Sequence, residues 1–114
     1  MRLALCLCFI VAALAKPGIA QGQLVDPFES GNNFVRECPK PAWQTACLSY
    51  VLGLYHGNQN VARAICLPSR VDTGQLYEVG STYIRNNPAE AHYPAFVLIM
   101  KSWRAAFPCP QPKK

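Results

Sequence analysis

The sequence predicts a small all-α domain of four to five helices, stapled by two disulfides. In several stretches the apolar residues recur at offsets of 3, 4, 7 and 8, which is the spacing of one face of an α-helix. Three of these stretches follow an aspartate, serine or asparagine with helix-capping spacing. No stretch alternates strictly between apolar and polar residues, which is the pattern of a half-buried β-strand.

Residues 1–20 are expected to be removed as a secretory signal peptide. Arg2 is followed by 13 uncharged residues, all apolar or small, and Gly18 and Ala20 flank the expected cleavage site, with Ala15 as the alternative. The apolar run is shorter than the roughly 20 residues that span a bilayer. The expected mature protein is a single exported domain, residues 21–114.

Cysteine content supports export. Removal of residues 1–20 leaves four cysteines, and an even number in a small exported chain predicts two disulfides. These are Cys38, Cys47, Cys66 and Cys109. Their spacing lacks the paired short intervals of structural zinc sites, so no metal is expected.

The charge of the mature chain excludes one class of partner. Residues 21–114 carry nine Lys or Arg and six Asp or Glu, a net charge of about +3, and the basic residues are scattered. A nucleic-acid site requires basic residues clustered along one face. We therefore expect no nucleic-acid partner, and no membrane contact once the signal peptide is removed.

The first predicted helix has two possible starts. Asp26 followed by Pro27 is one, and Ser30 with Asn33 is the other. Pro39 ends this helix, because its ring disfavours helical backbone at the preceding residue.

The second predicted helix, residues 41–56, is the centre of the fold. Its apolar stripe comprises Trp43, Ala46, Cys47, Tyr50, Val51 and Leu54. Gly53 lies beside this stripe, where a missing side chain would let another helix approach closely. Gly57 and Asn58 are expected to end the helix in the left-handed conformation.

Two further helices follow. Asp72 and Gln75 have capping-box spacing before a stripe from Leu76 to Ile84, and this helix is expected to end at Asn86 and Asn87. Asn87, Pro88 and Glu90 have the spacing that starts a last helix, and a bend or a restart of that helix is expected at Pro94. The last stripe comprises Phe96, Ile99, Met100, Trp103 and Phe107.

This helix order favours one disulfide pairing. An antiparallel hairpin brings Cys38 to Cys47, and an up-down pair of helices brings Cys66 to Cys109. Loop-closure entropy then gives about 2.7 kcal/mol for the short loop and about 4 kcal/mol for the long one. The two other connectivities stay open from the sequence alone.

Nothing in the sequence predicts an enzyme or a cofactor. His56 and His92 are the only histidines, Ser49 lies within a helix with no nucleophile elbow, and no cysteine stays free. The acidic residues include no Asp-x-Asp pair for calcium.

The aromatic residues on helical stripes are expected to pack in the core. Trp43, Tyr50 and Trp103, together with Gly53, are the predicted packing positions. Tyr55, Tyr77 and Tyr93 fall off the stripes or near helix ends, where they could contact a partner. The polar, proline-rich connection before Pro94 is expected to project, which makes its neighbourhood the candidate contact surface: Arg85, Asn86, Asn87, Glu90, His92 and Tyr93.

The order of motifs resembles a known family. The residues that carry the resemblance are Cys47, Tyr50-Val51, Gly53, Ile65-Cys66-Leu67-Pro68, Thr73-Gly74-Gln75-Leu76, Tyr83-Ile84, Asn87-Pro88, His92, Pro94-Ala95 and Phe107-Pro108-Cys109. Between Ser30 and Cys109 the chain resembles the Rap/Tai group of immunity proteins, which protect bacteria from amidase effectors delivered by type VI secretion.

The resemblance implies a periplasmic helical protein, often a homodimer, that binds a peptidoglycan amidase effector and occludes its papain-like Cys-His site. Two rival functions are a small periplasmic chaperone and a ligand-carrying helical module. Six carboxylates are few for an acid-activated chaperone. Two disulfides with several large aromatic residues favour a filled core over a ligand cavity.

Overall fold

The computed structural model describes Gly18, residues 25–58 and residues 63–111 of the 114-residue chain. This part of the chain holds the α-helices α1 (Gly31–Glu37), α2 (Pro41–Gly57), α4 (Thr73–Asn86) and α5 (Ala95–Ala106). Its one extended pairing is an isolated antiparallel bridge between Ile65 and Pro108. The all-α prediction is confirmed. The predicted signal peptide falls, apart from Gly18, outside the described residues.

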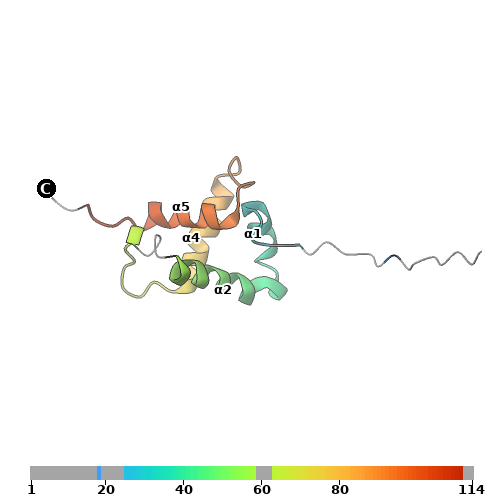
Figure 1. Cartoon of the computed structure of the whole chain (residues 1–114), viewed down its shortest axis with the longest axis horizontal. Helices are drawn as coiled ribbons and strands as arrows, with labels where there is room; N and C mark the ends of the chain where they lie inside the picture. The colour runs from blue at the N-terminus through green and yellow to red at the C-terminus, as the bar shows by residue number, and fades with distance from the viewer. Residues whose placement is uncertain (1–17, 19–24, 59–62, 112–114) are drawn as a thin grey trace, which may run out of the picture.

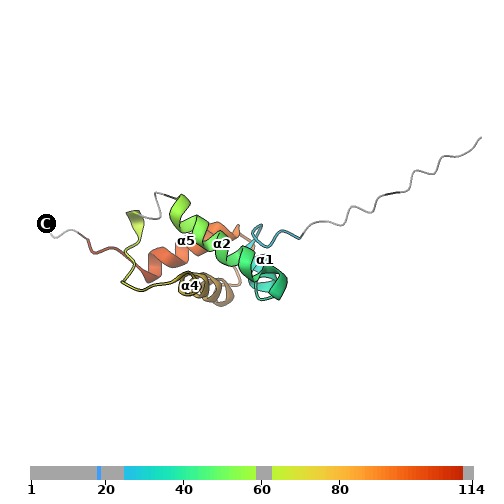
Figure 2. The same cartoon turned by 90° about the horizontal axis from the view of Figure 1, so that it is seen from below.

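The helices surround one core. In Figure 1, α5 and α2 cross the body on opposite sides, α4 runs behind them, and α1 closes one end. The view from below in Figure 2 places α2 in front of α5, with α4 alongside. Helix α4 is central to the packing, because it contacts α1, α2 and α5.

All four helices contribute to the core. Its largest fully buried side chains on these helices are Phe34, Val51, Ile84, Leu98, Ile99 and Trp103. The indole Nε1 of Trp103 donates a 2.9 Å hydrogen bond to the Leu76 carbonyl oxygen, so its one polar group is satisfied in the interior. Trp43 and Tyr50 are half-buried against this core.

Tyr50 links α2 to the segment before α1. Its ring stacks on Phe28 with the centroids 4.0 Å apart and the planes 15° apart. Burial, and secondarily the negative charge of Asp26, raises the pKa of the Tyr50 hydroxyl. The stacked pair therefore contributes apolar contact. The Tyr50 hydroxyl stays protonated to a higher pH than that of an exposed tyrosine.

The second of the two predicted starts for α1 is the one observed. Ser30 has extended backbone, and its Oγ accepts a 3.2 Å hydrogen bond from the Asn33 N–H. The alternative start at Asp26 is wrong. The Asp26 carboxylate accepts a 2.8 Å bond from the Phe28 N–H two residues later, which forms a turn instead of a helix.

Helix α4 begins with the predicted capping box. Asp72 Oδ1 accepts from the Gln75 N–H at 2.8 Å, and Gln75 Oε1 accepts from the Asp72 N–H at 3.1 Å. The left-handed end predicted for α2 is wrong, because Asn58 is extended at φ −111° and Gly57 has no positive φ.

The helical start predicted at Asn87 is also wrong. Residues 87–94 form successive hydrogen-bonded turns, such as the 3.0 Å bond from the Glu90 N–H to the Asn87 carbonyl. The Asn87 side chain does not cap a following helix. It donates to the Tyr83 carbonyl at 2.8 Å and so closes the end of α4.

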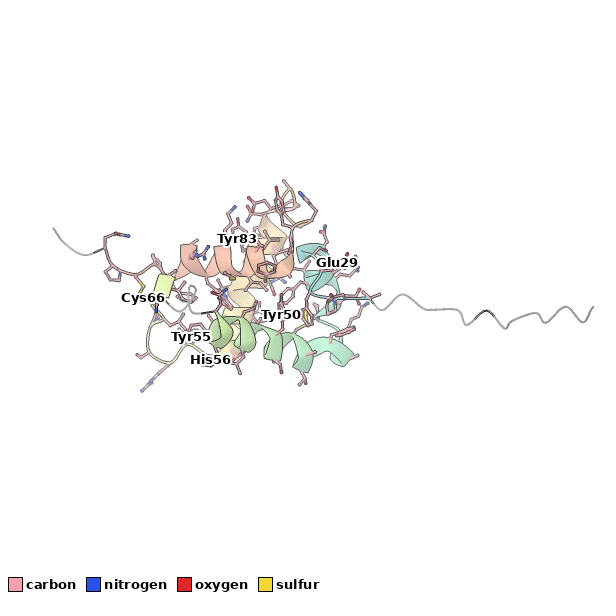
Figure 3. All side chains as sticks on the ribbon, viewed as in Figure 1. Glu29, Tyr50, Tyr55, His56, Cys66 and Tyr83 are labelled. Atoms are coloured by element: carbon pink, nitrogen blue, oxygen red, sulfur yellow. A yellow bond between two sulfur atoms is a disulfide. The ribbon has the colours of Figure 1, made fainter. Side chains whose placement is uncertain are left out.

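Both favoured disulfides are confirmed. Cys38 pairs with Cys47 across the α1–α2 hairpin, with a Cα–Cα distance of 5.8 Å. Cys66 pairs with Cys109 at 4.8 Å and ties the segment before α4 to the segment after α5. The first bond is buried in the core, whereas Cys66 is exposed. Figure 3 shows Cys66 near the carboxyl-terminal end of the described chain.

Gly53 does not have the predicted packing role. A Cβ built on Gly53 would meet no atom within 4 Å, and the residue is exposed. The close approaches lie elsewhere: a Cβ on Gly80 would stand 3.1 Å from Ile99 Cγ1, and one on Gly31 would stand 2.6 Å from Leu98 Cδ1. Because Gly31 of α1 and Gly80 of α4 have no side chain, α5 can pack closely against both helices.

We predict that Gly53→Ala and Gly80→Ala have opposite effects on the free energy of unfolding. Gly53→Ala should stabilise the protein by up to about 1 kcal/mol, because alanine restricts the unfolded chain and fits the open helix face. Gly80→Ala should destabilise it by up to about 2 kcal/mol, because the cost of displacing fully buried Ile99 outweighs the gain of up to about 1 kcal/mol in helix propensity. Urea unfolding followed by circular dichroism measures both. Equal effects would contradict the packing described for α4 and α5.

Candidate functional site: the α4–α5 corner and the outer face of α2

The turns of residues 87–94, here called the α4–α5 corner, are bonded to the amino-terminal end of α1. The Gly31 N–H donates to the Tyr93 carbonyl at 2.9 Å, and the Asn32 N–H donates to the Ala91 carbonyl at 2.8 Å. The first N–H groups of a helix have no partner within it, so these bonds satisfy donors that would otherwise need water. They also hold the backbone of the corner in one position.

A half-buried polar cluster joins the corner to α4 and α5. Tyr83 Oη donates to Glu90 Oε2 at 2.7 Å, and Lys101 Nζ donates to Glu90 Oε1 at 2.8 Å. Lys101 lies 5.8 Å from the centroid of the Tyr83 ring. Figure 3 shows Tyr83 on the opposite side of the molecule from Tyr55 and His56. Three chain segments thus meet at one carboxylate.

The cluster changes the acidity of its members. The Lys101 ammonium, and then the Tyr83 hydroxyl, lower the pKa of Glu90. The same contacts raise the pKa of Lys101, with Glu90 as the main cause. The half-buried Glu90 is therefore held as a carboxylate that bonds to both neighbours.

The predicted contact residues separate into two groups. Asn87 and Glu90 use their side chains within the protein, on Tyr83 and Lys101. Arg85 and Asn86 are exposed, as are His92 and Tyr93. Arg85 makes a long, exposed ion pair of 3.7 Å with Glu78.

His92 and Tyr93 are presented to solvent together. Their ring centroids are 4.3 Å apart, and Tyr93 is 49% exposed. Because the backbone on both sides is hydrogen-bonded, this pair can contact a partner without first being ordered.

Sequence reasoning missed Phe96 and Val97. Phe96 was expected in the core, but it is 44% exposed and Val97 is 40% exposed. The buried face of α5 consists of Ala95, Leu98, Ile99, Ser102 and Trp103. Two small residues on that face, Ala95 and Ser102, shift the buried face away from Phe96. We call the exposed set Tyr93, Phe96 and Val97 the corner stripe.

Helix α2 has a second apolar exposed surface. None of its 17 residues is Asp, Glu, Lys or Arg. Cys47 and Val51 are buried on its inner side, while Leu48 and Leu52 are 39% and 42% exposed on its outer side. Exposed leucines on two successive turns of an uncharged helix suit an apolar contact, which the described residues do not provide.

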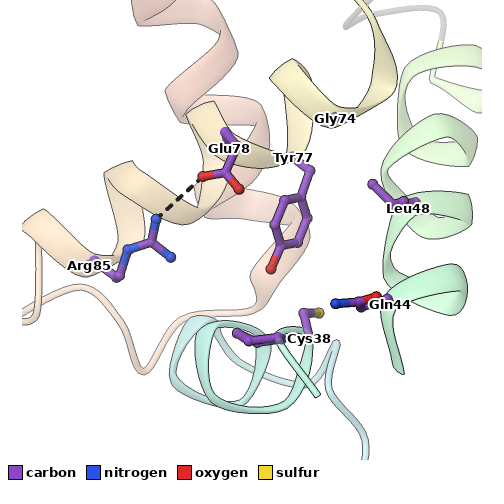
Figure 4. Close-up of a pocket in the computed structure, with 8 residues that line it drawn as sticks. Cys38, Gln44, Leu48, Gly74, Tyr77, Glu78 and Arg85 are labelled. Carbon is purple, nitrogen blue, oxygen red and sulfur yellow. Dashed lines mark ion pairs between the residues drawn. The ribbon is translucent and has the colours of Figure 1, made fainter. Parts of the chain in front are cut away.

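A groove of about 470 Å³ runs beside this face, between α2 and α4. Figure 4 shows Leu48 and Gln44 directed into it from α2 and Tyr77 from α4, with Cys38 of the buried disulfide at the end of α1. The Glu78–Arg85 ion pair lies along its α4 side. The groove has an apolar interior and a polar edge, which suits apolar side chains of a protein partner.

His56 and His92 each pack against a neighbouring tyrosine ring. Across the described ranges, no group of three His, Cys, Asp or Glu side chains could hold a metal ion. In the same ranges, no helix is both long and apolar enough to cross a membrane.

We predict that Glu90→Gln reduces the acid sensitivity of folding. Because the folded-state pKa of Glu90 is lowered from 4.5, its stabilisation is complete above that pH and is lost as the pH falls through the lowered value. The melting temperature of the wild type should fall more between pH 6 and pH 3 than that of Glu90→Gln. Glu29→Gln, on an exposed side chain, is the control and should behave as the wild type does.

Comparison with known proteins gives one match. The sequence model of the family described as Rap1a immunity proteins matches residues 30–109, which is more than half of the chain. No curated protein and no solved structure matches the chain. The matched range starts at the Ser30 cap of α1 and ends at Cys109, so it includes all four helices, both disulfides, the corner stripe and the groove.

Proposed function

The chain belongs to the family of Rap1a immunity proteins, and from this membership we propose that it neutralises a type VI secretion effector. The proposed effector is a peptidoglycan amidase. The immunity protein binds it and covers its active site, so inhibition is steric and requires no turnover by this chain. Removal of residues 1–20 leaves residues 21–114 as the periplasmic protein.

The α4–α5 corner is the observation that carries this proposal. An inhibitor that enters a cleft binds more tightly when its inserted element is already ordered, because ordering it on binding costs free energy. The corner is held by α1 through Gly31 and Asn32 and by α5 through Lys101. It nevertheless presents His92 and Tyr93 to solvent.

The proposed contact surface combines residues expected from the sequence with residues found in the structure. Tyr93 and Phe96 supply aromatic area, which is enriched among residues that dominate binding energy. Asn86 and Arg85 extend the surface along the end of α4. Asn87 and Glu90 act indirectly, because their side chains hold the corner in place.

The disulfides support the periplasmic location. Disulfides persist in oxidising compartments and are rare where thiols are kept reduced. The Cys66–Cys109 bond is partly exposed and joins segments 43 residues apart, so a reducing environment would reach it. An oxidising compartment preserves this link between the two ends of the helical body.

We also propose a homodimer formed by the outer face of α2. Two copies of a mature chain with net charge of about +3 repel each other except where the contact carries no charge, and α2 has no charged Asp, Glu, Lys or Arg. The face offers both an apolar protrusion and a groove, since exposed Leu52 lies on α2 one turn beyond Leu48, which lines the α2–α4 groove. A twofold axis would place a leucine of each copy in the groove of the other.

We predict inhibition of amidase effectors by the mature protein. Binding should be measured by calorimetry, and inhibition by peptidoglycan release, against purified type VI amidase effectors encoded in the same genome. Tyr93→Ala should weaken binding to the susceptible effector at least about tenfold, since a buried interface tyrosine often contributes more than 1.4 kcal/mol. Val25→Ala is the matched control, because Val25 is 45% exposed and lies outside the corner. Absence of binding at micromolar concentrations to every such amidase would refute the proposed function.

We predict that Leu52→Glu makes the protein monomeric. Light scattering after size exclusion should give twice the protomer mass for the wild type and a single protomer mass for Leu52→Glu, because the variant buries a charge in the contact. Val97→Glu is the control, since Val97 has almost the same exposure on α5, and it should stay dimeric. A wild type that is monomeric at high micromolar concentration would refute the proposed dimer.

A further inference from the structure

Helix α5 and everything after it lack acidic residues. Glu90 is the last Asp or Glu in the sequence, and residues 91–114 contain only basic charges. On α5 these are Lys101 and Arg104, and both are exposed. The exposed side of α5 therefore combines apolar side chains with uncompensated positive charge.

The two charges are not equivalent. Lys101 is bonded to Glu90 at 2.8 Å, so a carboxylate of this chain already neutralises it. Arg104 makes no ion pair or side-chain hydrogen bond with any described residue. An exposed guanidinium with its donors unused is suited to a carboxylate supplied by another molecule, which it can bind with two parallel hydrogen bonds.

Arg104 lies on the same side of α5 as the corner stripe. Phe96, Val97 and Arg104 are exposed and are spaced 0, 1 and 8 residues along the helix, which places them on one side, with the half-buried Met100 between them. At about 1.5 Å per residue, Phe96 and Arg104 lie about 12 Å apart along the axis. The surface of one partner protein can therefore contact Phe96 and Arg104 at the same time.

We propose that the exposed side of α5 recognises an apolar protein surface edged by carboxylates, with Phe96 as the apolar anchor and Arg104 as the carboxylate ligand. The inference rests on the proposed function, because the surface it describes belongs to the effector. It adds the chemistry of that surface: at least one large apolar pocket or patch for Phe96, and an Asp or Glu about 12 Å from it, the distance set by the helical rise.

The charge on α5 and the size of its apolar face argue against two other partners, a second copy of this chain and a membrane. A second copy would bring no carboxylate to Arg104 through the same face, because α5 has no acidic residue. A membrane surface requires a long apolar face with several cations. Here the inner face of α5 is in the core, and two large exposed apolar side chains, Phe96 and Val97, remain with Arg104, which has no ion pair within the described residues.

The first experiment measures the dissociation constant for the purified type VI amidase effector that the wild type inhibits. Phe96→Ala should raise it at least about tenfold, by analogy with interface aromatic residues. Arg104→Glu should raise it at least about tenfold at about 50 mM salt, because the attraction becomes a repulsion. Salt screens this repulsion, so the affinity of Arg104→Glu should no longer fall as salt rises to about 300 mM, whereas that of the wild type should. Each variant is first compared with the wild type by thermal unfolding, since both side chains are exposed and folding should be unchanged.

Two matched variants control for general effects. Val25→Ala removes a comparably exposed apolar side chain outside α5, and Arg63→Glu reverses an exposed charge outside α5. Both should keep the wild-type dissociation constant within about threefold. Wild-type affinity in Phe96→Ala and Arg104→Glu would overturn the inference while leaving inhibition, and thus the proposed function, intact.

A second experiment does not depend on an amidase. Random 12-residue peptides displayed on phage are selected on the immobilised mature protein and counter-selected on Phe96→Asp. Enriched peptides should contain large apolar residues together with Asp or Glu, and should lose binding to Arg104→Glu. Enrichment of basic peptides would overturn the inference. Binding to phosphatidylglycerol vesicles that disappears in Phe96→Asp would also overturn it, in favour of a membrane.

Discussion

The hydrogen bonds between the start of α1 and the α4–α5 corner hold together the parts of the structure that matter for function. Gly31 and Asn32 donate to carbonyl oxygens of the corner, and Gly31 has no room for a side chain beside Leu98. The contact is possible only because a glycine begins the helix. It orders the corner and brings α1 against α5 at the same time. A seven-residue helix is too short to be stable alone, so α1 also depends on this contact.

The disulfides supplement a core that is small for its surface. The buried Cys38–Cys47 bond fixes the α1–α2 hairpin, and Cys66–Cys109 fixes the opposite end of the body. Domains of this size bury only about two thirds of the surface that the unfolded chain exposes, so cross-links contribute a large share of their stability. With both ends fixed, the exposed side chains of α2 and α5 can contact partners without rearrangement of the helices.

Two exposed apolar surfaces with different electrostatic character suggest two kinds of contact. The outer face of α2 has no charged side chain and lies beside a groove, which suits an identical copy of a positively charged protein. The exposed side of α5 has aromatic area beside a free arginine, which suits an acidic partner. In a family of immunity proteins, this arrangement would let one molecule dimerise and bind its effector through separate surfaces.

The sequence by itself determined that the domain is helical, the order of its helices, the capping box of Asp72 and the end of α1 before Pro39. It favoured the observed disulfide pairing without excluding the others, and it left two starts of α1 open. The features that it determined depend on contacts within a few residues, or on how adjacent helices connect. Only the tertiary structure decided which side of each helix is buried. Ala95 and Ser102 take places on the inner side of α5 because α4 approaches it closely at Gly80, and this leaves Phe96 in solvent. Gly53 has open space because nothing covers α2 there. When a helix has apolar residues on more than one side, its sequence does not show which side packs against the other helices. The contact surfaces of α2 and α5 could therefore not be predicted from hydrophobic periodicity.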